Sequence, residues 1–385
     1  MAEHSSPQHV PPGSEARAGE LLAPPLPAGR RPHETILNLL PTLILGLLLI
    51  ATIFWVEHGT GKYIQRVVIG IGIDIILVVS LNLSNGFTGV FSLGHIGFMA
   101  LGAYSSAILT LPLKAKGLNL PDLPAWLAGV QLAYLPALLI GGLLAAIVGF
   151  LVGYPMMRLK GHYVAVATLG FLVIVRVVLI NADAFTRGSR TFSGVLPYTT
   201  LWWVYGWAAL TVYVVWRIVR SPYGRAMLAV REDEIAARSI GVNVLHARLV
   251  AFCVSAFLTG VAGGLWAHFL TSFSPNSFYF VETFAIITML VVGGMGSISG
   301  SVIAAVGLTA LSELLRNAER GVSLGPVHLP PLYGLSQILL SVFFVLVMIY
   351  RREGLLGSRE IDIGWISRRL RQAIASPAQR APERR

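Results

Sequence analysis

Charge is what this sequence has least of. Only 12% of its 385 residues are Asp, Glu, Lys or Arg, whereas 55% are hydrophobic, and the mean hydropathy is +0.71. A soluble domain carries about 25% charged and about 45–50% apolar residues. With half the usual number of charged side chains, the chain has too few to cover a water-exposed surface. This excludes a soluble globular protein and indicates a membrane protein.

Residues for covalent, metal or phosphate chemistry are also scarce. The single cysteine, Cys253, excludes an internal disulfide framework. No Cys and His cluster has metal-site spacing, and no Gly-x-Ser-x-Gly elbow is present. The only Gly-Lys pair, Gly61-Lys62, is followed by Tyr63 and preceded by Val56 where a P-loop requires glycine. The sequence therefore predicts no catalytic residue, no metal and no cofactor.

Long apolar runs, by contrast, are abundant. A helix needs about 20 apolar residues to cross a hydrocarbon core of about 30 Å. The alternating segments of about ten residues that are typical of an outer-membrane barrel are not seen. The sequence therefore predicts an all-α fold, a polytopic transmembrane helical bundle with about ten passes or half-passes. The expected segments are 36–56, 64–83, 92–111, 130–154, 162–180, 200–219, 250–272, 283–296, 298–315 and 333–350.

Glycine is concentrated between the eighth and ninth segments, where four of the eight residues in 293–300 are glycine. Because glycine adopts backbone conformations that interrupt a helix, this stretch favours a sharp bend or a broken helix over one straight span. An even number of passes returns a basic C-terminus to the side of the N-terminus, which ten passes satisfy and nine do not. We therefore expect a glycine-rich helix break between two passes or two half-helices.

The net charge of +11 depends mainly on arginine, since the chain has only four lysines. In an all-helical membrane chain, such an excess marks cytoplasmic loops rather than a nucleic-acid site. Arg158, Lys160, the arginines around 220–249 and both termini are therefore expected in the cytoplasm. Lys114 and Lys116 fall on the outer side in this scheme and violate the rule.

The sequence divides into three regions. Residues 1–35 are rich in Pro, Ala, Gly and Glu without apolar periodicity, which predicts a disordered cytoplasmic N-terminal tail. The transmembrane domain covers 36–350. Residues 351–385 contain nine arginines and predict a basic cytoplasmic C-terminal tail, with at most a short interfacial helix around 361–374.

The longest polar segment between two apolar runs is 221–249. Pro222 and Gly224 are expected to break the preceding helix, and the acidic residues after Arg231 to begin a new short helix, because acidic side chains favour a helix start. Gly241 is placed to end that helix. From the residues alone, the segment is either a short surface helix across the cytoplasmic face or an ordinary connecting loop.

This segment also carries a resemblance to a known family. Residues 231–243 resemble the coupling loop of importer-type ABC permeases, in particular that of the branched-chain amino-acid permease family. Within that family the chain resembles the M-type subunit, one of two different permeases that pair. The resemblance covers roughly 65–350. Its other motifs, in chain order, are Ser-Leu-Asn-Leu at 80–83, Phe-Ser-Leu-Gly-His-Ile-Gly-Phe at 91–98, Gly-His-Tyr at 161–163 running to Ala-Thr-Leu-Gly-Phe at 167–171, and Gly-Gly-Met-Gly-Ser at 293–297.

The resemblance implies the membrane-spanning subunit of an ATP-driven importer for branched-chain (aliphatic) amino acids in the bacterial inner membrane. Such a subunit pairs with a second permease, is driven by two ATPase subunits and receives substrate from an extracytoplasmic binding protein. Membrane lipid surrounds it, and no nucleic acid is expected as a partner. In the importer signature a Glu directly precedes Ala-Ala, whereas here Ile235 stands at that position. Coupling to the ATPase is assigned to Arg231, Glu234, Ala236, Ala237 and Gly241.

Polar residues inside the apolar segments have two interpretations. They line a path for a polar zwitterion, to which the backbone groups of a broken helix contribute, or they form interhelical hydrogen bonds, which are worth about 0.6 kcal/mol each on average. The residues expected near the path are Asn82, Ser92, His95, Thr168, Gly293, Gly294 and Gly296.

Two other functions remain open from the sequence. One is an importer of the same architecture for another small polar solute, such as urea or an amide. The other is a secondary transporter, which needs no ATPase but requires an ion-coupled intramembrane carboxylate. Asp74, in the middle of the second segment, is the one central candidate for that role.

Overall fold

The computed structural model divides the chain into two units, residues 1–51 with 362–385 and residues 52–361. The described part of the first unit is one helical stretch, the beginning of α2 (Pro32–Gly59). The second unit is a bundle of helices. Side chains are described from residue 46 onward. The residues that the structure describes are 32–159, 161–319, 323–324, 327–328, 334–351, 353–357 and 360.

Each of the ten predicted apolar segments is a helix, which confirms the all-α bundle. After α2 they are α3 (Lys62–Thr88), α4 (His95–Thr110), α7 (Tyr134–Met156), α8 (Tyr163–Asn181), α10 (Leu201–Val219), α13 (Val244–Leu270), α14 (Phe280–Gly293), α15 (Ile298–Glu319) and α16 (Leu335–Tyr350). The short elements between them are α5 (Leu113–Asn119), α6 (Ala125–Ala128), α9 (Asp183–Thr186), α11 (Pro222–Glu232), α12 (Glu234–Ser239), the 3-10 helix η1 (Pro275–Ser277) and the antiparallel strands β1 (Ser323–Leu324) and β2 (Val327–His328).

Within the described residues, six helical stretches are long and apolar enough to cross a membrane: α3, α7, α8, α13, α15 and Pro275–Gly293, which joins η1 to α14. A seventh results if α4 and α5, which meet at a bend of 119°, form one broken span. The apolar part of α2, Gly46–Gly59, and α16 are shorter. The predicted total of ten passes or half-passes therefore stays a prediction.

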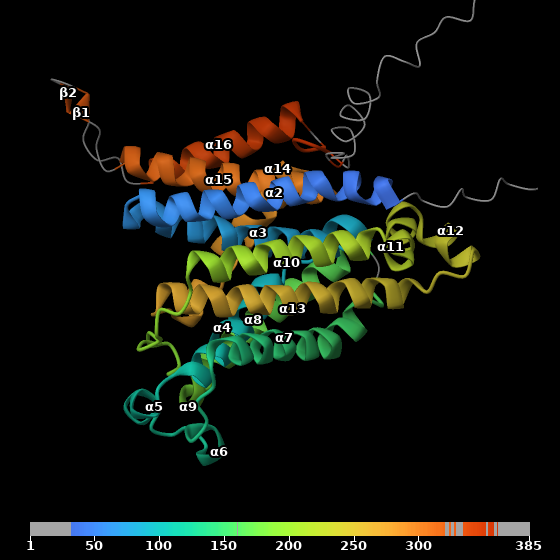
Figure 1. Cartoon of the computed structure of the whole chain (residues 1–385). Coiled ribbons are helices and arrows are strands. Elements are labelled where there is room, and N and C mark those ends of the chain that lie inside the picture. The colour runs from blue at the N-terminus through green and yellow to red at the C-terminus, as the bar shows by residue number, and fades with distance from the viewer. Residues whose placement is uncertain are drawn as a thin grey trace, which may run out of the picture. The chain divides into compact units, whose positions relative to one another are not determined.

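Helix α13 occupies the middle of the bundle, where it packs against α3, α4 and α7 (Figure 1). Small residues allow this close packing. A Cβ atom on Gly102 of α4 would overlap the backbone of Gly260, and one on Gly263 would overlap the backbone of Met99. Close backbone approach at small residues stabilises helix pairs in lipid, where burial of apolar side chains supplies little net driving force.

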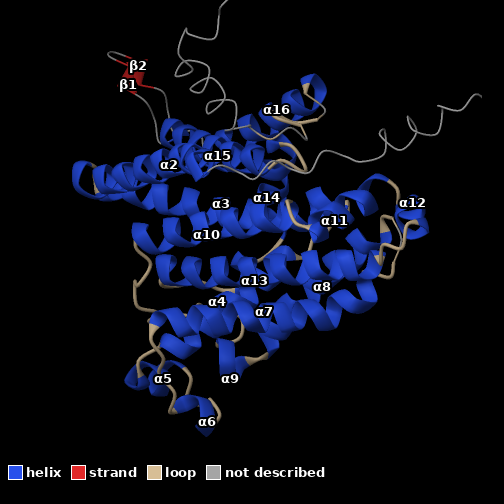
Figure 2. Ribbon diagram, turned by 45° about the vertical axis from the view of Figure 1, so that its right-hand side comes forward, coloured by secondary structure: helices blue, strands red, loops and turns tan. Residues whose placement is uncertain are grey.

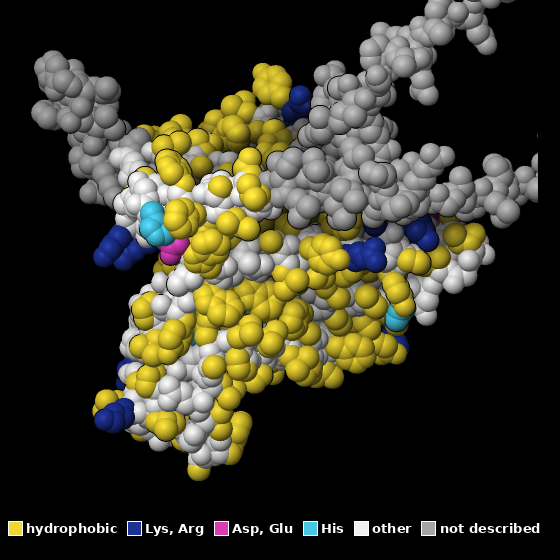
Figure 3. Space-filling model, in the orientation of Figure 1, with side chains coloured by type: hydrophobic (Ala, Val, Ile, Leu, Met, Phe, Trp, Pro, Cys, Tyr) yellow, Lys and Arg dark blue, Asp and Glu magenta, His cyan; other side chains and the backbone are white. Residues whose placement is uncertain are grey.

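The short helices gather at the two ends of the bundle. In both views α5, α6 and α9 lie at one end and α11 and α12 at the other (Figures 1 and 2). Hydrophobic side chains cover much of the face between them (Figure 3). The α11–α12 end carries the arginines of 217–248, so the positive-inside rule assigns it to the cytoplasm.

Lys116, which violates that rule, has a structural explanation. Its side chain is buried, and its ammonium group donates hydrogen bonds to the carbonyl oxygens of Leu127, at 3.2 Å, and of Val130. These bonds fasten α5 to the chain that follows α6. Lys116 is therefore a structural group of the outer segment rather than a free charge.

The described residues include little of the expected tails. Residues 1–31 and 361–385, with the interfacial helix expected around 361–374, lie outside them, as does Lys160. Helix α2 begins at Pro32, four residues before the first expected segment. At the other end, Leu355 donates a backbone hydrogen bond to the Val292 carbonyl at 2.7 Å. The chain just after residue 351 is therefore bound to α14.

The arrangement of the short helices predicts the topology. Reporter fusions after residues 120 and 190 should report an extracytoplasmic location, because α5, α6 and α9 share one end of the bundle. Fusions after residues 235 and 365 should report the cytoplasm, because of the arginine-rich end and the basic C-terminal segment. An extracytoplasmic signal at 235 would overturn the orientation of every later helix.

Candidate functional site

The segment predicted as a coupling loop consists of two short helices, which differs from the expected single helix beginning after Arg231. The preceding helix, α10, ends where expected, but α11 begins directly after it. The hydroxyl group of Ser221 accepts a hydrogen bond from the Gly224 N–H at 3.4 Å and caps α11, and Pro222 occupies the first turn of α11. Arg231 lies in the last turn of α11. Residues 244–249, expected in the loop, are the first turns of α13.

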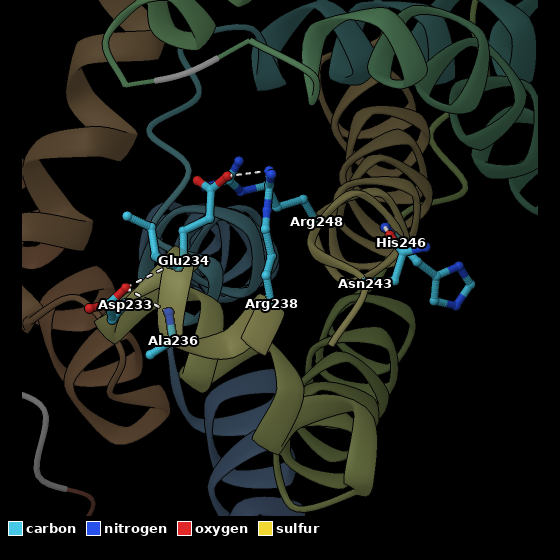
Figure 4. Close-up of polar contacts among 8 residues, drawn as sticks. Asp233, Glu234, Ala236, Arg238, Asn243, His246 and Arg248 are labelled. Atoms are coloured by element: carbon cyan, nitrogen blue, oxygen red, sulfur yellow. Dashed lines mark hydrogen bonds and ion pairs between the residues drawn. The ribbon is translucent and has the colours of Figure 1, made fainter. Parts of the chain in front are cut away.

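Asp233 separates the two helices and begins the second one. Its backbone is extended, with φ −152° and ψ 111°, and its carboxylate accepts hydrogen bonds from the N–H groups of Ile235, at 2.8 Å, and Ala236, at 3.0 Å (Figure 4). An acidic N-cap residue accepts hydrogen bonds from otherwise unpaired N–H groups, and its negative charge interacts favourably with the positive end of the helix dipole. The Asp233 cap therefore fixes where α12 begins.

Gly241 ends α12 in the way the sequence predicts. Its φ of +86° is favourable for glycine, its N–H donates to the Arg238 carbonyl at 3.0 Å, and the Val242 N–H donates to the Ala237 carbonyl at 3.0 Å. These two bonds form the Schellman motif, which satisfies the last carbonyl groups of a helix. The helix is therefore defined at both ends by specific residues.

Glu234 fastens α12 to the bundle. One carboxylate oxygen lies 2.6 Å from Nη2 of Arg238, one turn along α12, and the other lies 2.8 Å from Nη2 of Arg248 in α13 (Figure 4). Ala237 is buried, whereas Ala236 faces outward. Glu234 and Ala237 thus hold the helix in place, and the opposite side is left exposed.

Arg231 points into the bundle and not toward the outer face of α12. Its Nη1 donates a hydrogen bond to the carbonyl oxygen of Gly86 in α3, at 2.8 Å. Its Cγ lies over Gly89, whose φ of +71° ends α3, and a Cβ there would come within 3.3 Å of that carbon. The structure therefore separates Arg231 from the other residues predicted to bind an ATPase.

The predicted helix break is present between α14 and α15. Gly294 and Gly296 have φ values of +109° and +91°, which L side chains rarely adopt. Gly293 packs against the backbone of Gly300, so the two half-helices meet without intervening side chains. These three glycines were expected near a substrate path, and the structure places them at the α11–α12 end of the bundle.

Asn82 of α3 pairs the backbone groups that the break exposes. Its Oδ1 accepts from the Gly296 N–H at 2.9 Å, and its Nδ2 donates to the Ser297 carbonyl at 2.9 Å and to the Ser301 hydroxyl group at 2.8 Å. Asn82 is fully buried. The amide therefore bonds protein groups with both its oxygen and its nitrogen, and stabilises the turn between the half-helices.

The chain after α16 closes the other side of the break. The Leu356 N–H donates to the Gly293 carbonyl at 3.3 Å. The carboxylate of Glu360 accepts hydrogen bonds from the N–H groups of Ile298, at 2.5 Å, and Ser299, at 3.2 Å. Glu360 thus acts as an acidic cap on the first turn of α15. Sequence analysis missed this role because a cap normally lies next to its helix, and Glu360 is 62 residues away.

A second polar cluster surrounds the start of α4, deep in the bundle. His95 Nδ1 lies 3.0 Å from the Ser92 hydroxyl oxygen, and its Nε2 lies 2.6 Å from the hydroxyl oxygen of Ser255 in α13. The Leu93 N–H donates to the hydroxyl group of Thr168 in α8 at 2.9 Å. Ser92, His95 and Thr168 therefore lie together, whereas Asn82 and the glycines form the separate group at the break, and the substrate path expected at these residues stays a prediction.

The sequence did not single out Ser255 or Thr259, both in α13. The Ser255 hydroxyl group donates to the Ser80 carbonyl at 2.6 Å, and the Ser80 hydroxyl lies 3.0 Å from that of Thr259. Small polar residues in an apolar run were the available signal. A small pocket opens beside this cluster, and its lining is mostly apolar: Leu81, Ser92, Leu93, His95, Ile96, Thr283, Ile286 and Ile287.

Two charged residues within the apolar helices, Asp74 and Arg176, form hydrogen bonds with side chains of other elements. Asp74 accepts a hydrogen bond from the Thr309 hydroxyl group of α15 at 2.8 Å. Arg176 donates to the Asn276 side chain at 2.7 Å and lies over the ring of Tyr279. No group of three or more His, Cys, Asp or Glu residues within that part of the chain is arranged to hold a metal ion.

The contacts of Asn82 predict a large effect of its removal. Asn82→Ala removes the hydrogen-bond partner of the Gly296 N–H, and an unpaired buried group costs about 1–3 kcal/mol, whereas the Ser297 carbonyl still accepts from Ser301. Thermal unfolding in detergent should therefore show a clear loss of stability. Ser105→Ala is the control, because that hydroxyl group donates to carbonyl oxygens of its own helix only, and it should change stability by less than about 0.5 kcal/mol. Equal effects of the two changes would contradict the assigned role of Asn82.

Comparison with known proteins gives matches over most of the chain. Residues 63–350 match the family model described as "Branched-chain amino acid transport system / permease component". The high-affinity branched-chain amino acid transport system permease protein LivM of Escherichia coli (strain K12) is 33% identical over 358 residues, which cover 84% of this chain and 76% of that protein. LivM of Salmonella typhimurium is 32% identical over 319 residues, covering 74% of this chain and 68% of the relative.

A more distant relative has the name of a second type of permease. The LivH protein of Salmonella typhimurium is 25% identical over 185 residues, which cover 48% of this chain and 56% of that protein. No solved structure matches the chain. The helical bundle, the broken helix and the matches over most of the sequence agree, and the chain belongs to the family of branched-chain amino acid transport permeases.

Proposed function

We propose that this chain is the membrane-spanning permease subunit of an ATP-driven importer of branched-chain amino acids. It is a multi-pass protein of the bacterial inner membrane. The observation that carries the proposal is the construction of α12, a short capped helix at the arginine-rich end of the bundle. Hydrolysis takes place on partner subunits, and this chain supplies the passage.

The exposed side of α12 supports docking to an ATPase. Ile235 and Ile240 are 79% and 76% exposed, although they stand on a helix held rigidly by its two caps and by Glu234. We call these two isoleucines the docking face. Apolar side chains that are held exposed on a rigid element fit an apolar depression on a partner protein. A flexible connecting loop would not require this construction.

The expected assembly contains more than one chain type. Relatives with the names LivM and LivH both match this sequence, which supports a pair of different permeases in one transport system. We further propose two ATPase subunits on the cytoplasmic side and a binding protein that delivers substrate on the other side. The second permease lies against the apolar outer faces of this bundle within the lipid.

The pocket beside His95 has the composition expected for an aliphatic zwitterion. Its polar side is formed by Ser92, His95 and Thr283, and its apolar side includes Ile286 and Ile287. The Thr283 hydroxyl group can hydrogen-bond an ammonium or carboxylate group without a net counter-charge, and the isoleucines can accept an aliphatic side chain. His95 becomes available to a substrate when its bonds to Ser92 and Ser255 open. We propose that substrate passes this point when α14 moves relative to α4.

The C-cap of α12 predicts a specific uncoupled variant. Gly241→Pro removes an N–H group that donates to Arg238 and imposes a φ of about −65° where the chain has +86°. ATP hydrolysis should then continue with strongly reduced uptake, because α12 loses its defined end. Gly241→Asn is the matched control, since Asn tolerates positive φ values, and it should retain most of the uptake. Normal uptake by the proline variant would mean that α12 is a connector only.

The substrate class is tested by uptake into proteoliposomes that contain all subunits. Labelled leucine should accumulate with ATP and not without it, while glutamate and urea should not accumulate. Leucine, isoleucine and valine should differ little at the permease, because one methylene changes binding by only about 1–3 kcal/mol. Uptake of urea without leucine would favour a different solute, and uptake without ATP would favour a secondary transporter.

A further inference from the structure

The guanidinium group of Arg231 joins the α11–α12 segment to the break between α14 and α15. Its Nη1 donates to the Gly86 carbonyl at 2.8 Å. A Cβ atom placed on Gly296, in the turn between the two half-helices, would overlap the same Nη1. The arginine therefore contacts α3 by a hydrogen bond and the glycine-rich turn by direct packing.

Asn82 contacts the same two glycines, Gly86 and Gly296. A Cβ on Gly86 would overlap the Asn82 Oδ1 atom and would approach the Gly296 nitrogen to 2.5 Å. The Gly296 N–H donates to that Oδ1 atom at 2.9 Å. Gly296 thus lies between Arg231 and Asn82 with no space on either side.

This geometry suits the transfer of a displacement. A guanidinium group is planar and always charged, and its hydrogen bond to a carbonyl is stronger than one between neutral groups. The stem of Arg231 is supported by Gly89, so the side chain cannot swing away without losing packing. Gly296, the residue it touches in the turn, has no side chain that could absorb a shift. A movement of α11 is therefore passed to Gly296 directly.

Another contact between this segment and the bundle leads elsewhere. The ion pair of Glu234 with Arg248 joins α12 to α13, which is one continuous helix of 27 residues. A continuous helix has no internal joint at which two halves can move separately. The break between α14 and α15 does have such a joint, and α14 carries the pocket residues Ile286 and Ile287.

We propose that Arg231 is the positioning residue through which movement of α11 and α12 reaches the glycine-rich break and thereby α14. The inference rests on the proposed function, since it requires an ATPase that moves α12. Arg231 does not touch substrate or nucleotide in this scheme. It sets the position of the turn at 294–297 for each position of α11.

The test measures the turn itself in the complete complex. Met295, which is 40% exposed in the turn, is replaced by cysteine in a Cys253→Ala background. The full complex of both permeases and the ATPases is placed in lipid nanodiscs. We compare the rate at which a maleimide labels the cysteine at position 295 in two states, without nucleotide and after trapping with ATP and vanadate. ATP hydrolysis and uptake into vesicles are measured for the same variants.

Arg231→Ala should abolish the nucleotide-dependent change in labelling while hydrolysis continues, and uptake per ATP should fall by about 2- to 30-fold, the range found for residues along a coupling network. Arg231→Lys, which retains the charge, should restore part of the change. Arg225→Ala, an exposed arginine of the same helix, should leave the change intact. A melting temperature in detergent close to that of the parent protein shows that the Ala variant is folded.

The outcomes separate the two proposals. If the parent complex changes its labelling with nucleotide and Arg231→Ala changes it equally, Arg231 does not position the turn and this inference is wrong, while the importer function stands. If no ATPase assembles with the parent protein, or if nucleotide does not drive uptake, the proposed function itself fails. If nucleotide drives uptake by the parent complex without changing the labelling at 295, this inference alone is wrong. Loss of the change in Arg225→Ala as well would also overturn the specific role of Arg231.

Discussion

The hydrogen bonds of Asn82 are the interaction on which the functional part of this structure depends. The turn between α14 and α15 is packed into the bundle, where its backbone groups need protein partners in place of water. Asn82 pairs the Gly296 N–H and the Ser297 carbonyl from a neighbouring helix, and Glu360 caps the start of α15 from the far end of the chain. The Ser297 carbonyl also accepts the Ser301 N–H at 3.1 Å, as in a regular helix, whereas the N–H groups of Gly296, Ile298 and Ser299 are paired by side chains. The continuous backbone hydrogen-bond pattern is therefore interrupted on the N–H side of the turn, and side chains stabilise it there.

The C-terminal half of α3 serves as a common frame for both polar sites. Asn82 holds the break, while Asn85, one turn later, exchanges two hydrogen bonds of 3.1 Å with the backbone of Ser92 at the entry to α4. Ser80 accepts from Ser255 through its carbonyl oxygen. A displacement of α3 would therefore alter the break and the His95 cluster together. The last nine residues of α3 contain five buried hydroxyl or amide side chains, and those of Ser80, Asn82 and Asn85 form hydrogen bonds to residues outside the helix.

Sequence alone predicted the helices and the motifs but not how the helices face one another. The lengths of the apolar runs, the break at 293–300 and the end of α12 at Gly241 all follow from local chemistry. The inward direction of Arg231 does not, because it depends on a hydrogen bond to Gly86, a residue of another helix 145 positions away in the sequence. Pro222 is a local example. A proline can end one helix, as expected here from the sequence, but it also suits the first turn of a new helix, which is its place in α11.

The departure from the importer signature has a physical consequence in this structure. Glu234 stands one position before the expected Glu, and from there its carboxylate reaches Arg248 in the bundle while Ile235 faces outward. The charge therefore fastens α12 to its own subunit, and the position left for the partner is apolar. An exposed ion pair contributes little to binding, whereas an isoleucine that is buried on association contributes about 1.5–3 kcal/mol. An ATPase that docks here must accordingly offer an apolar depression, and the strength of its attachment should depend little on salt.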